Sequence, residues 1–160
     1  MGNLFEITTE PLRHEPVVEA VSAPGVGGVV TFAGNVRLWS RGKRVSYLDY
    51  DAYPEMATKY LRQIGDEIKD RWGIEHVAIV HRIGHLEIGE TSVIIAVGSP
   101  HRREAFEACH YAIDRLKEIV PIWKKEVWED GEVWIGLEPN SYDRANPAGS
   151  PFVANEQSIR

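Results

Sequence analysis

Two amphipathic segments set among short β-branched runs place the strongest limit on how this chain can fold. In residues 54–72, apolar side chains recur at three- and four-residue spacing, and the opening proline suits the first turn of a helix. A second segment begins at Ser99 and Pro100, a predicted N-cap followed by a first-turn proline, and runs to about Ile119. The runs around these segments are rich in residues that favour strands. The sequence therefore predicts an α+β fold with antiparallel sheets and two main helices.

The β-branched runs predict short strands. They cover residues 4–8, 27–33, 45–53, 77–80, 92–97, 122–128 and 133–136, and the last two are expected to form a hairpin. A short helix is predicted over 16–21, and the basic segment 34–44, which ends in turn residues, is expected to be an exposed loop. After residue 139 the composition shifts toward Asn, Ser, Pro, Gly and Ala. We therefore expect a single domain over residues 1–139 and a mobile C-terminal tail over 140–160.

Charge and cysteine content exclude several classes of function. The chain has 160 residues and a formal net charge of −6, so it lacks the overall positive field on which generic binding to nucleic acid or to anionic membranes depends. No apolar run approaches the ~20 residues of a membrane span, and the start has no signal-peptide core. A single cysteine, Cys109, excludes an internal disulfide and fits a reducing compartment. We expect a cytoplasmic protein whose anion sites are local.

Basic residues nevertheless gather in three places. These are Arg37 with Arg41, Lys43 and Arg44; His101 with Arg102 and Arg103; and Arg115 and Lys117 with Lys124 and Lys125. Each cluster can be ordinary solvated surface. The second can also be an anion site, because the first turn of a helix exposes unpaired N–H groups and a partial positive charge, and His101 and Arg102 could hold a phosphate there. A helix can also start at Ser99 without any ligand, so both interpretations stay open.

Lys117 and Lys124 flank the point where the second predicted helix ends. Lys117 lies near the helix end, where the helix dipole favours a cation even without any function, and Lys124 lies on the strand after Pro121. The chain turns between them, which could bring both ammonium groups into one pocket. Paired cations lower each other's pKa, so one of them could then act as a base.

The length of the second helix limits which of these residues can work together. His101 and Lys117 are sixteen residues apart in sequence, and at ~1.5 Å per residue a continuous helix separates them by ~24 Å. They cannot share a small-molecule pocket within one chain. Either they are unrelated, or one site joins the helix start of one subunit to the lysine end of another, as a twofold dimer allows.

Other candidate residues point to no chemistry. Cys109 lies on the apolar stripe of its helix, where a cysteine is usually an inert small hydrophobe. His81 and His85 are four residues apart, but Gly84 and the strand context keep them off a helix face, so a zinc pair is discounted. We expect no metal site and no cofactor.

The motifs at these positions together resemble the large, catalytic subunit of molybdopterin synthase. The likeness covers roughly residues 5–136. It is carried by 32–37 (FAGNVR), 50–57 (YDAYPEMA), 81–84 (HRIG), 99–102 (SPHR), 120–126 (VPIWKKE) and 130–131 (DG) with Trp134. The chain departs from the family's usual pattern after the loop arginine, where Leu38, Trp39 and Ser40 replace more polar residues, and in the tail from Asn140.

The resemblance implies a sulfurtransferase of molybdenum-cofactor biosynthesis with an α/β-hammerhead fold and a catalytic domain over 1–139. In that family the large subunit forms a central homodimer, and a small ubiquitin-like sulfur carrier inserts its C-terminal Gly-Gly thiocarboxylate into each active site, giving a heterotetramer. Two sulfurs pass in turn to cyclic pyranopterin monophosphate and form the dithiolene of molybdopterin.

By position, the resemblance assigns roles to five residues. Lys117 and Lys124 match the family's essential lysines, Arg37 matches its loop arginine, and His101 with Arg102 match its anion-binding pair. We expect Lys117 to contact the terminal carbonyl of the carrier, Lys124 to act as acid or base at the pterin, and the other three to hold the phosphate. Two rival functions stay open: a non-catalytic module that binds an anion or a carrier, and a different phosphate-handling enzyme.

Overall fold

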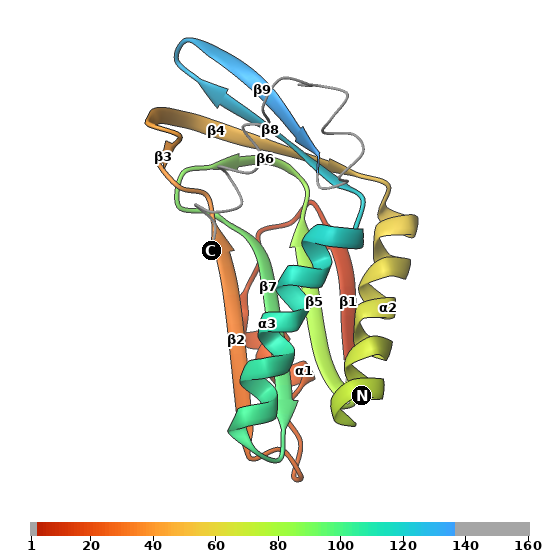
Figure 1. The fold of residues 1–160 in the computed structure, drawn as a ribbon. Helices are drawn as coiled ribbons and strands as arrows, with labels where there is room; N and C mark the ends of the chain where they lie inside the picture. The colour runs from red at the N-terminus through yellow and green to blue at the C-terminus, as the bar shows by residue number, and fades with distance from the viewer. Residues whose placement is uncertain (1–2, 137–160) are drawn as a thin grey trace.

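The computed structural model describes residues 3–136, which form two β-sheets and three helices (Figure 1). In chain order the elements are β1 (Asn3–Thr8), α1 (His14–Ala20), β2 (Gly28–Asn35), β3 (Trp39–Ser40), β4 (Lys43–Ala52), α2 (Pro54–Trp72), β5 (His76–Arg82), β6 (Gly84–Glu87), β7 (Thr91–Ser99), α3 (Arg102–Ile119), β8 (Ile122–Trp128) and β9 (Gly131–Gly136). None of the helices within these residues is long and apolar enough to cross a membrane.

The first sheet has the strand order β1-β5-β7-β2 and is covered by helices on both faces (Figure 1). Because side chains alternate along a strand, Val77 and Ile79 of β5 pack in the core under α2 and α3, whereas Ala78 and Val80 pack in the core under α1. Both faces are therefore buried, which explains why β5 and β7 are almost continuously apolar.

Local signals fix the two long helices. Pro54 occupies the first turn of α2, and Gly73 ends it in the left-handed region at φ 67°, where its N–H donates to the carbonyl of Lys69. The buried stripe of α3 consists mainly of alanines and Leu116, which let the helix lie close to the sheet. In Figure 1, α3 runs along the first sheet and its last turn reaches the second sheet. The residues that follow α3 therefore enter the second sheet directly.

The second sheet has the order β3-β4-β8-β9, with β6 also paired to β4. Its own small core contains Val36, Val45, Leu48 and Leu86. The chain enters this sheet after β2, after β5 and again after α3, so the ends of those elements lie beside it (Figure 1). The junction between the sheets is thus lined by residues from distant parts of the sequence.

The α+β class and both main helices are confirmed, and so is the hairpin of β8 and β9. Two details differ from a wholly antiparallel arrangement of predicted strands. β1 pairs parallel with β5, and the residues between the predicted strands 77–80 and 92–97 contain a further strand, β6, which pairs with β4. Both pairings join strands that are distant in sequence, and the local propensity of a segment does not indicate its pairing partner.

Two further predictions are corrected, and a third concerns residues outside the described range. Segment 34–44 is not wholly an exposed loop, because it contains β3, and Ser40 is buried. The N-cap of α3 is His101 rather than Ser99, since β7 continues through Ser99. The predicted tail at 140–160 lies outside the described residues, so the division at residue 139 stays a prediction.

Candidate active site

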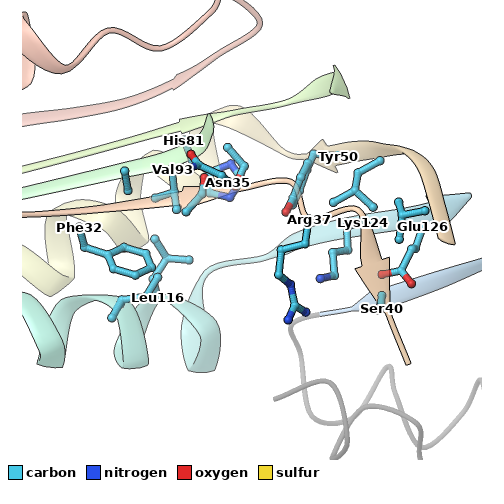
Figure 2. A pocket seen from close by; sticks show the side chains of 16 residues that line it. Phe32, Asn35, Arg37, Ser40, Tyr50, His81, Val93, Leu116, Lys124 and Glu126 are labelled. Atoms are coloured by element: carbon cyan, nitrogen blue, oxygen red, sulfur yellow. Dashed lines mark hydrogen bonds between the residues drawn. The ribbon is translucent and has the colours of Figure 1, made fainter. Parts of the chain in front are cut away.

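A cavity of about 340 Å³ lies where the two sheets and the end of α3 meet. Phe32, Val93 and Leu116 provide its apolar wall (Figure 2). Its polar lining consists of Asn35, Arg37, Ser40, Tyr50, His81, Ser92, Lys124 and Glu126. A mostly apolar hollow into which a few polar groups converge is typical of a small-molecule site.

The loop after β2 holds Arg37 at this cavity. The pairing of β2 with β7 changes register at Asn35, and such a bulge bends the strand. The backbone of Val36 then donates to the carbonyl of Glu90 at 2.9 Å and accepts from the N–H of Gly89 at 2.8 Å. These bonds fix the loop, so Arg37 has a defined position although its side chain is exposed.

Alternation along β8 separates two adjacent lysines. Lys124 and Glu126 lie on the face that lines the cavity. Lys125 lies on the other face, where its ammonium is 3.7 Å from Asp49 and sits 5.6 Å from the ring centre of Trp134. Of these two adjacent lysines, Lys124 therefore lines the cavity and Lys125 lies outside it.

The charges around Lys124 show which basic residues converge. Burial lowers the pKa of Lys124 to about 8, while the nearby carboxylate of Glu126 acts in the opposite direction and raises it. The positive charges of Lys117, Arg37 and Arg41 lower the pKa further, so all three lie close enough to interact with the Lys124 ammonium. Figure 2 shows Arg37 and Lys124 at the same part of the cavity. Lys117 and Lys124 therefore lie near each other, although Lys117 is not among the residues that line this cavity.

Lys117 lines a second hollow that adjoins the first. This groove, of about 680 Å³, runs between α3 and β2 and shares Phe32 and Ile113 with the cavity. Phe106, which is 62% exposed, also lines the groove. Lys117 thus lines a largely apolar groove that adjoins the cavity containing Lys124.

His101 and Arg102 lie at the other end of α3. Both side chains are exposed, and α3 is one continuous helix from Arg102 to Ile119. Within one chain the helix therefore keeps His101 ~24 Å from Lys117. The structure brings together Arg37, Lys117 and Lys124 but not the predicted anion-binding pair.

Comparison with known proteins decides the family. The family model described as MoaE protein matches residues 7–119. The chain belongs to the MoaE family. It is 52% identical over 155 residues to the molybdopterin synthase catalytic subunit of Halalkalibacterium halodurans, covering 96% of this chain and 97% of that protein. It is also 52% identical over 145 residues to the protein of the same name in Bacillus subtilis, covering 89% and 92%.

A solved structure agrees with the fold of this MoaE family member. The crystal structure of molybdopterin synthase from Staphylococcus aureus matches with a TM-score of 0.80 and 53% sequence identity, covering 82% of this chain and 96% of that chain. The resemblance found in the sequence motifs is therefore confirmed.

Sequence reasoning missed the inner wall of this MoaE cavity. Tyr50, His81 and Glu126 all line it, and Trp128 donates its indole N–H to Glu126 at 2.7 Å. The alternation of β8 could have found Glu126, since it lies two residues after Lys124. Tyr50 and His81 come from strands of different sheets, and their edge-to-face contact at 5.1 Å had no signal in the sequence.

His81 is buried as a neutral ring. It is 3% exposed, and its Nδ1 lies 2.8 Å from the carbonyl of Arg82, to which the neutral ring donates. Burial lowers the pKa of His81 to about 4. The unfolded chain, with an ordinary histidine pKa, therefore binds the proton more readily between pH 6.5 and 4.

Stability should consequently fall as the pH drops from 6.5 to 4. The contribution of His81 is fully present above pH 6.5, and roughly 3 kcal/mol of it is lost by pH 4. Urea unfolding of the wild type and His81→Gln at pH 7, 5.5 and 4.5 measures this loss. The variant should show a shallower decline, whereas His14→Gln, which alters an exposed histidine, should keep the wild-type slope. Parallel curves for His81→Gln and the wild type would contradict the assignment.

Two further observations, one on Cys109 and one on possible metal ligands, limit the chemistry. Burial raises the pKa of Cys109 to about 11, so its thiol stays protonated and is a poor nucleophile at neutral pH. Within residues 3–136, no cluster of three or more histidine, cysteine or acidic side chains is placed to hold a metal ion.

Proposed function

We propose that this chain is the catalytic subunit of a molybdopterin synthase. It transfers sulfur from the C-terminal thiocarboxylate of a small ubiquitin-like carrier to cyclic pyranopterin monophosphate and forms the molybdopterin dithiolene. Relatives that are 52% identical over most of the chain carry the name of this subunit. A cytoplasmic location remains part of the proposal.

One observation carries the proposal: three cations act on one partly enclosed lysine. Arg37, Arg41 and Lys117 all lower the pKa of Lys124, and the group has a value of about 8. A base works best when its pKa lies near the working pH, so this environment suits proton transfer. A module that only bound an anion would gain more from a lysine that stays fully charged.

The residue roles follow from charge and position. Lys117 faces the open groove, so we assign it to the terminal carbonyl of the carrier, where an ammonium stabilises developing negative charge. Lys124 lines the adjoining cavity, and we assign it to proton removal at the pterin. Arg37 contributes to binding the phosphate, which is an anion.

The distance along α3 supports a site shared between two subunits. In a twofold dimer, α3 would pack antiparallel to its copy, and midway between His101 and Lys117 lies Cys109. Cys109 lines the open groove together with the exposed Phe106. Pairing of the two grooves would bury this apolar surface and bring His101 and Arg102 of the partner to Lys117.

We further propose a heterotetramer in which each of the two sites receives one carrier. A C-terminal Gly-Gly tail has no side chains to anchor, so it needs a narrow channel and main-chain contacts. We assign the tail to the groove that contains Lys117, because this groove adjoins the cavity that contains Lys124.

Product formation tests the function against its two rivals. The purified chain is incubated with a thiocarboxylated carrier and pyranopterin substrate, and the dithiolene product is measured by conversion to a fluorescent derivative. The matched control is the same carrier ending in an ordinary carboxylate, which has no sulfur to give. We expect product with the first carrier and none with the second.

The other outcomes identify the rivals. Binding of both ligands without product would support a non-catalytic module. Turnover of the pyranopterin phosphate without sulfur transfer would support a different phosphate-handling enzyme. Either result would refute the synthase assignment.

A further inference from the structure

The turn between β3 and β4 places an arginine where glycine or asparagine is usual. The two residues of the turn, Arg41 and Gly42, have φ of 53° and 74°. Two positive values in a two-residue hairpin are typical of a type I′ turn, for which Asn-Gly is preferred. Within residues 3–136, Arg41 is the one non-glycine residue with positive φ. The hairpin thus keeps an unfavourable backbone conformation for this side chain, a pattern often found at functional sites.

Arg41 and its neighbour carry buried donors that no described residue satisfies. The Nε and Nη2 atoms of Arg41 are buried and have no hydrogen-bond partner within residues 3–136. The same is true of the hydroxyl of Ser40, which is 5% exposed and lines the cavity. Buried donors without acceptors are costly, and most of all on a charged group. Three donors on two adjacent residues therefore lack an acceptor.

The surroundings of Arg41 favour an anion as that acceptor. Its charge lowers the pKa of Lys124, so it lies close to the cations of the cavity. The nearby carboxylates have other partners: Glu126 accepts from Trp128, and Asp130 pairs with Lys43 at 3.2 Å. Neither carboxylate forms an ion pair with Arg41 within the described residues, although Glu126 keeps its negative charge in the same cavity.

The hairpin is held in place, so the donors are arranged before any ligand arrives. The ammonium of Lys43 reaches Asp130 and also sits 4.7 Å from the ring centre of Trp128. Both contacts fasten the β3–β4 hairpin to the β8–β9 hairpin. A preorganised set of donors binds a ligand with little loss of conformational freedom.

We propose that Arg41 and Ser40 form an oxyanion-binding site at the hairpin end of the cavity, which takes a carboxylate or phosphate group of a reacting molecule. The guanidinium presents a planar fork that matches two oxygens of such a group, and the serine hydroxyl adds a third donor. This inference rests on the proposed function for the identity of its ligands. Those ligands are the phosphate of the pyranopterin and the C-terminal carboxylate that the carrier bears once its sulfur has left.

The test uses a variant that should improve the turn while it removes the fork. Arg41→Asn keeps a residue that tolerates positive φ before Gly42, so the hairpin should form at least as well. Ser40→Ala removes the hydroxyl, and Arg41→Lys keeps the charge without the fork. The matched control is Arg44→Gln, which removes one positive charge from the same hairpin. Arg44 is exposed and pairs with Trp39, so its side chain leaves the face opposite to Ser40.

Two probes distinguish the sources of the oxyanion. Calorimetric titration with inorganic phosphate tests a phosphate site, and titration with a synthetic peptide that ends in Gly-Gly with a free carboxylate tests a carrier site. We expect Arg41→Asn to weaken binding of one probe by roughly ten- to a hundred-fold, and Ser40→Ala to weaken it by less. Arg41→Lys should be impaired as well, because a point charge does not replace a bidentate fork. Arg44→Gln should bind as the wild type does.

Selective loss of phosphate or of peptide binding supports the site and names its ligand. Wild-type affinity for both probes in Arg41→Asn would overturn the proposal. An equal loss of affinity in Arg44→Gln would overturn it too, because the effect would then come from the overall positive charge of the hairpin. These titrations need no turnover. A protein that binds through Arg41 but makes no dithiolene therefore refutes the proposed function alone, and an active synthase with unchanged Arg41→Asn binding refutes this inference alone.

Discussion

Replacing Lys117 with alanine is expected to abolish dithiolene formation while the protein stays folded and dimeric. Lys117 lies on α3 and lines the groove that adjoins the cavity containing Lys124, with which it interacts electrostatically. Loss of its ammonium removes the charge that stabilises the carrier's terminal carbonyl as it reacts. Loss of such a group typically costs roughly 10²- to 10⁴-fold in rate. Single-turnover product formation with the thiocarboxylated carrier measures the effect.

A lysine in the last turn of the other long helix provides the control. Lys69 lies in the last turn of α2, pairs with Glu75 at 3.1 Å and does not line the cavity. Lys69→Ala should therefore react at the wild-type rate, and light scattering should give the same mass for both variants. Full activity of Lys117→Ala would refute its role. Loss of dimer mass in that variant would instead make Lys117 a residue of the interface.

Mixing two inactive variants tests whether the site is shared. A Lys117→Ala subunit keeps Arg102, and an Arg102→Ala subunit keeps Lys117, so a mixed dimer has one intact site if the two residues meet across the interface. With free exchange of subunits at equal amounts, about a quarter of the wild-type activity should return. No recovery despite demonstrated exchange would show that Arg102 and Lys117 do not serve one site in trans.

The sequence was most informative where local patterns decide the structure. The apolar spacing of 54–72 and the proline at its start predict α2, and the same logic predicts α3. That Lys117 and Lys124 lie near each other was also accessible, because Pro121 separates a helix end from the strand that follows it. Each of these predictions needs only neighbours in sequence.

The inner cavity could not be predicted because its wall joins two sheets. Tyr50 comes from β4 and His81 from β5, and their contact depends on how the sheets meet. Ser40 belongs to a segment whose basic residues indicated an exposed loop, yet the hairpin with β4 buries it. Strand register and the packing of one sheet on another are tertiary properties that composition does not specify.

Lys124 should impose a rising pH profile on the chemical step. Burial lowers the pKa of Lys124 to about 8, so about a tenth of it is the neutral base at pH 7 and most of it above pH 9. If the neutral amine removes a proton at the pterin, the single-turnover rate should increase about ten-fold across this range and then level off. Lys124→Ala should lose roughly 10²- to 10⁴-fold in rate together with the pH dependence.

Neighbouring residues on β8 make the assignment specific. Glu126 raises the pKa of Lys124, so Glu126→Gln should move the rising limb to lower pH. Lys125→Ala removes the adjacent lysine, which lies on the other strand face beside Asp49, and should leave the limb in place. Because both variants act on the same substrates, a limb that belongs to a substrate group would be identical in all of them. A rate that falls above pH 8 would instead make Lys124 the proton donor, since only its charged form can give up a proton.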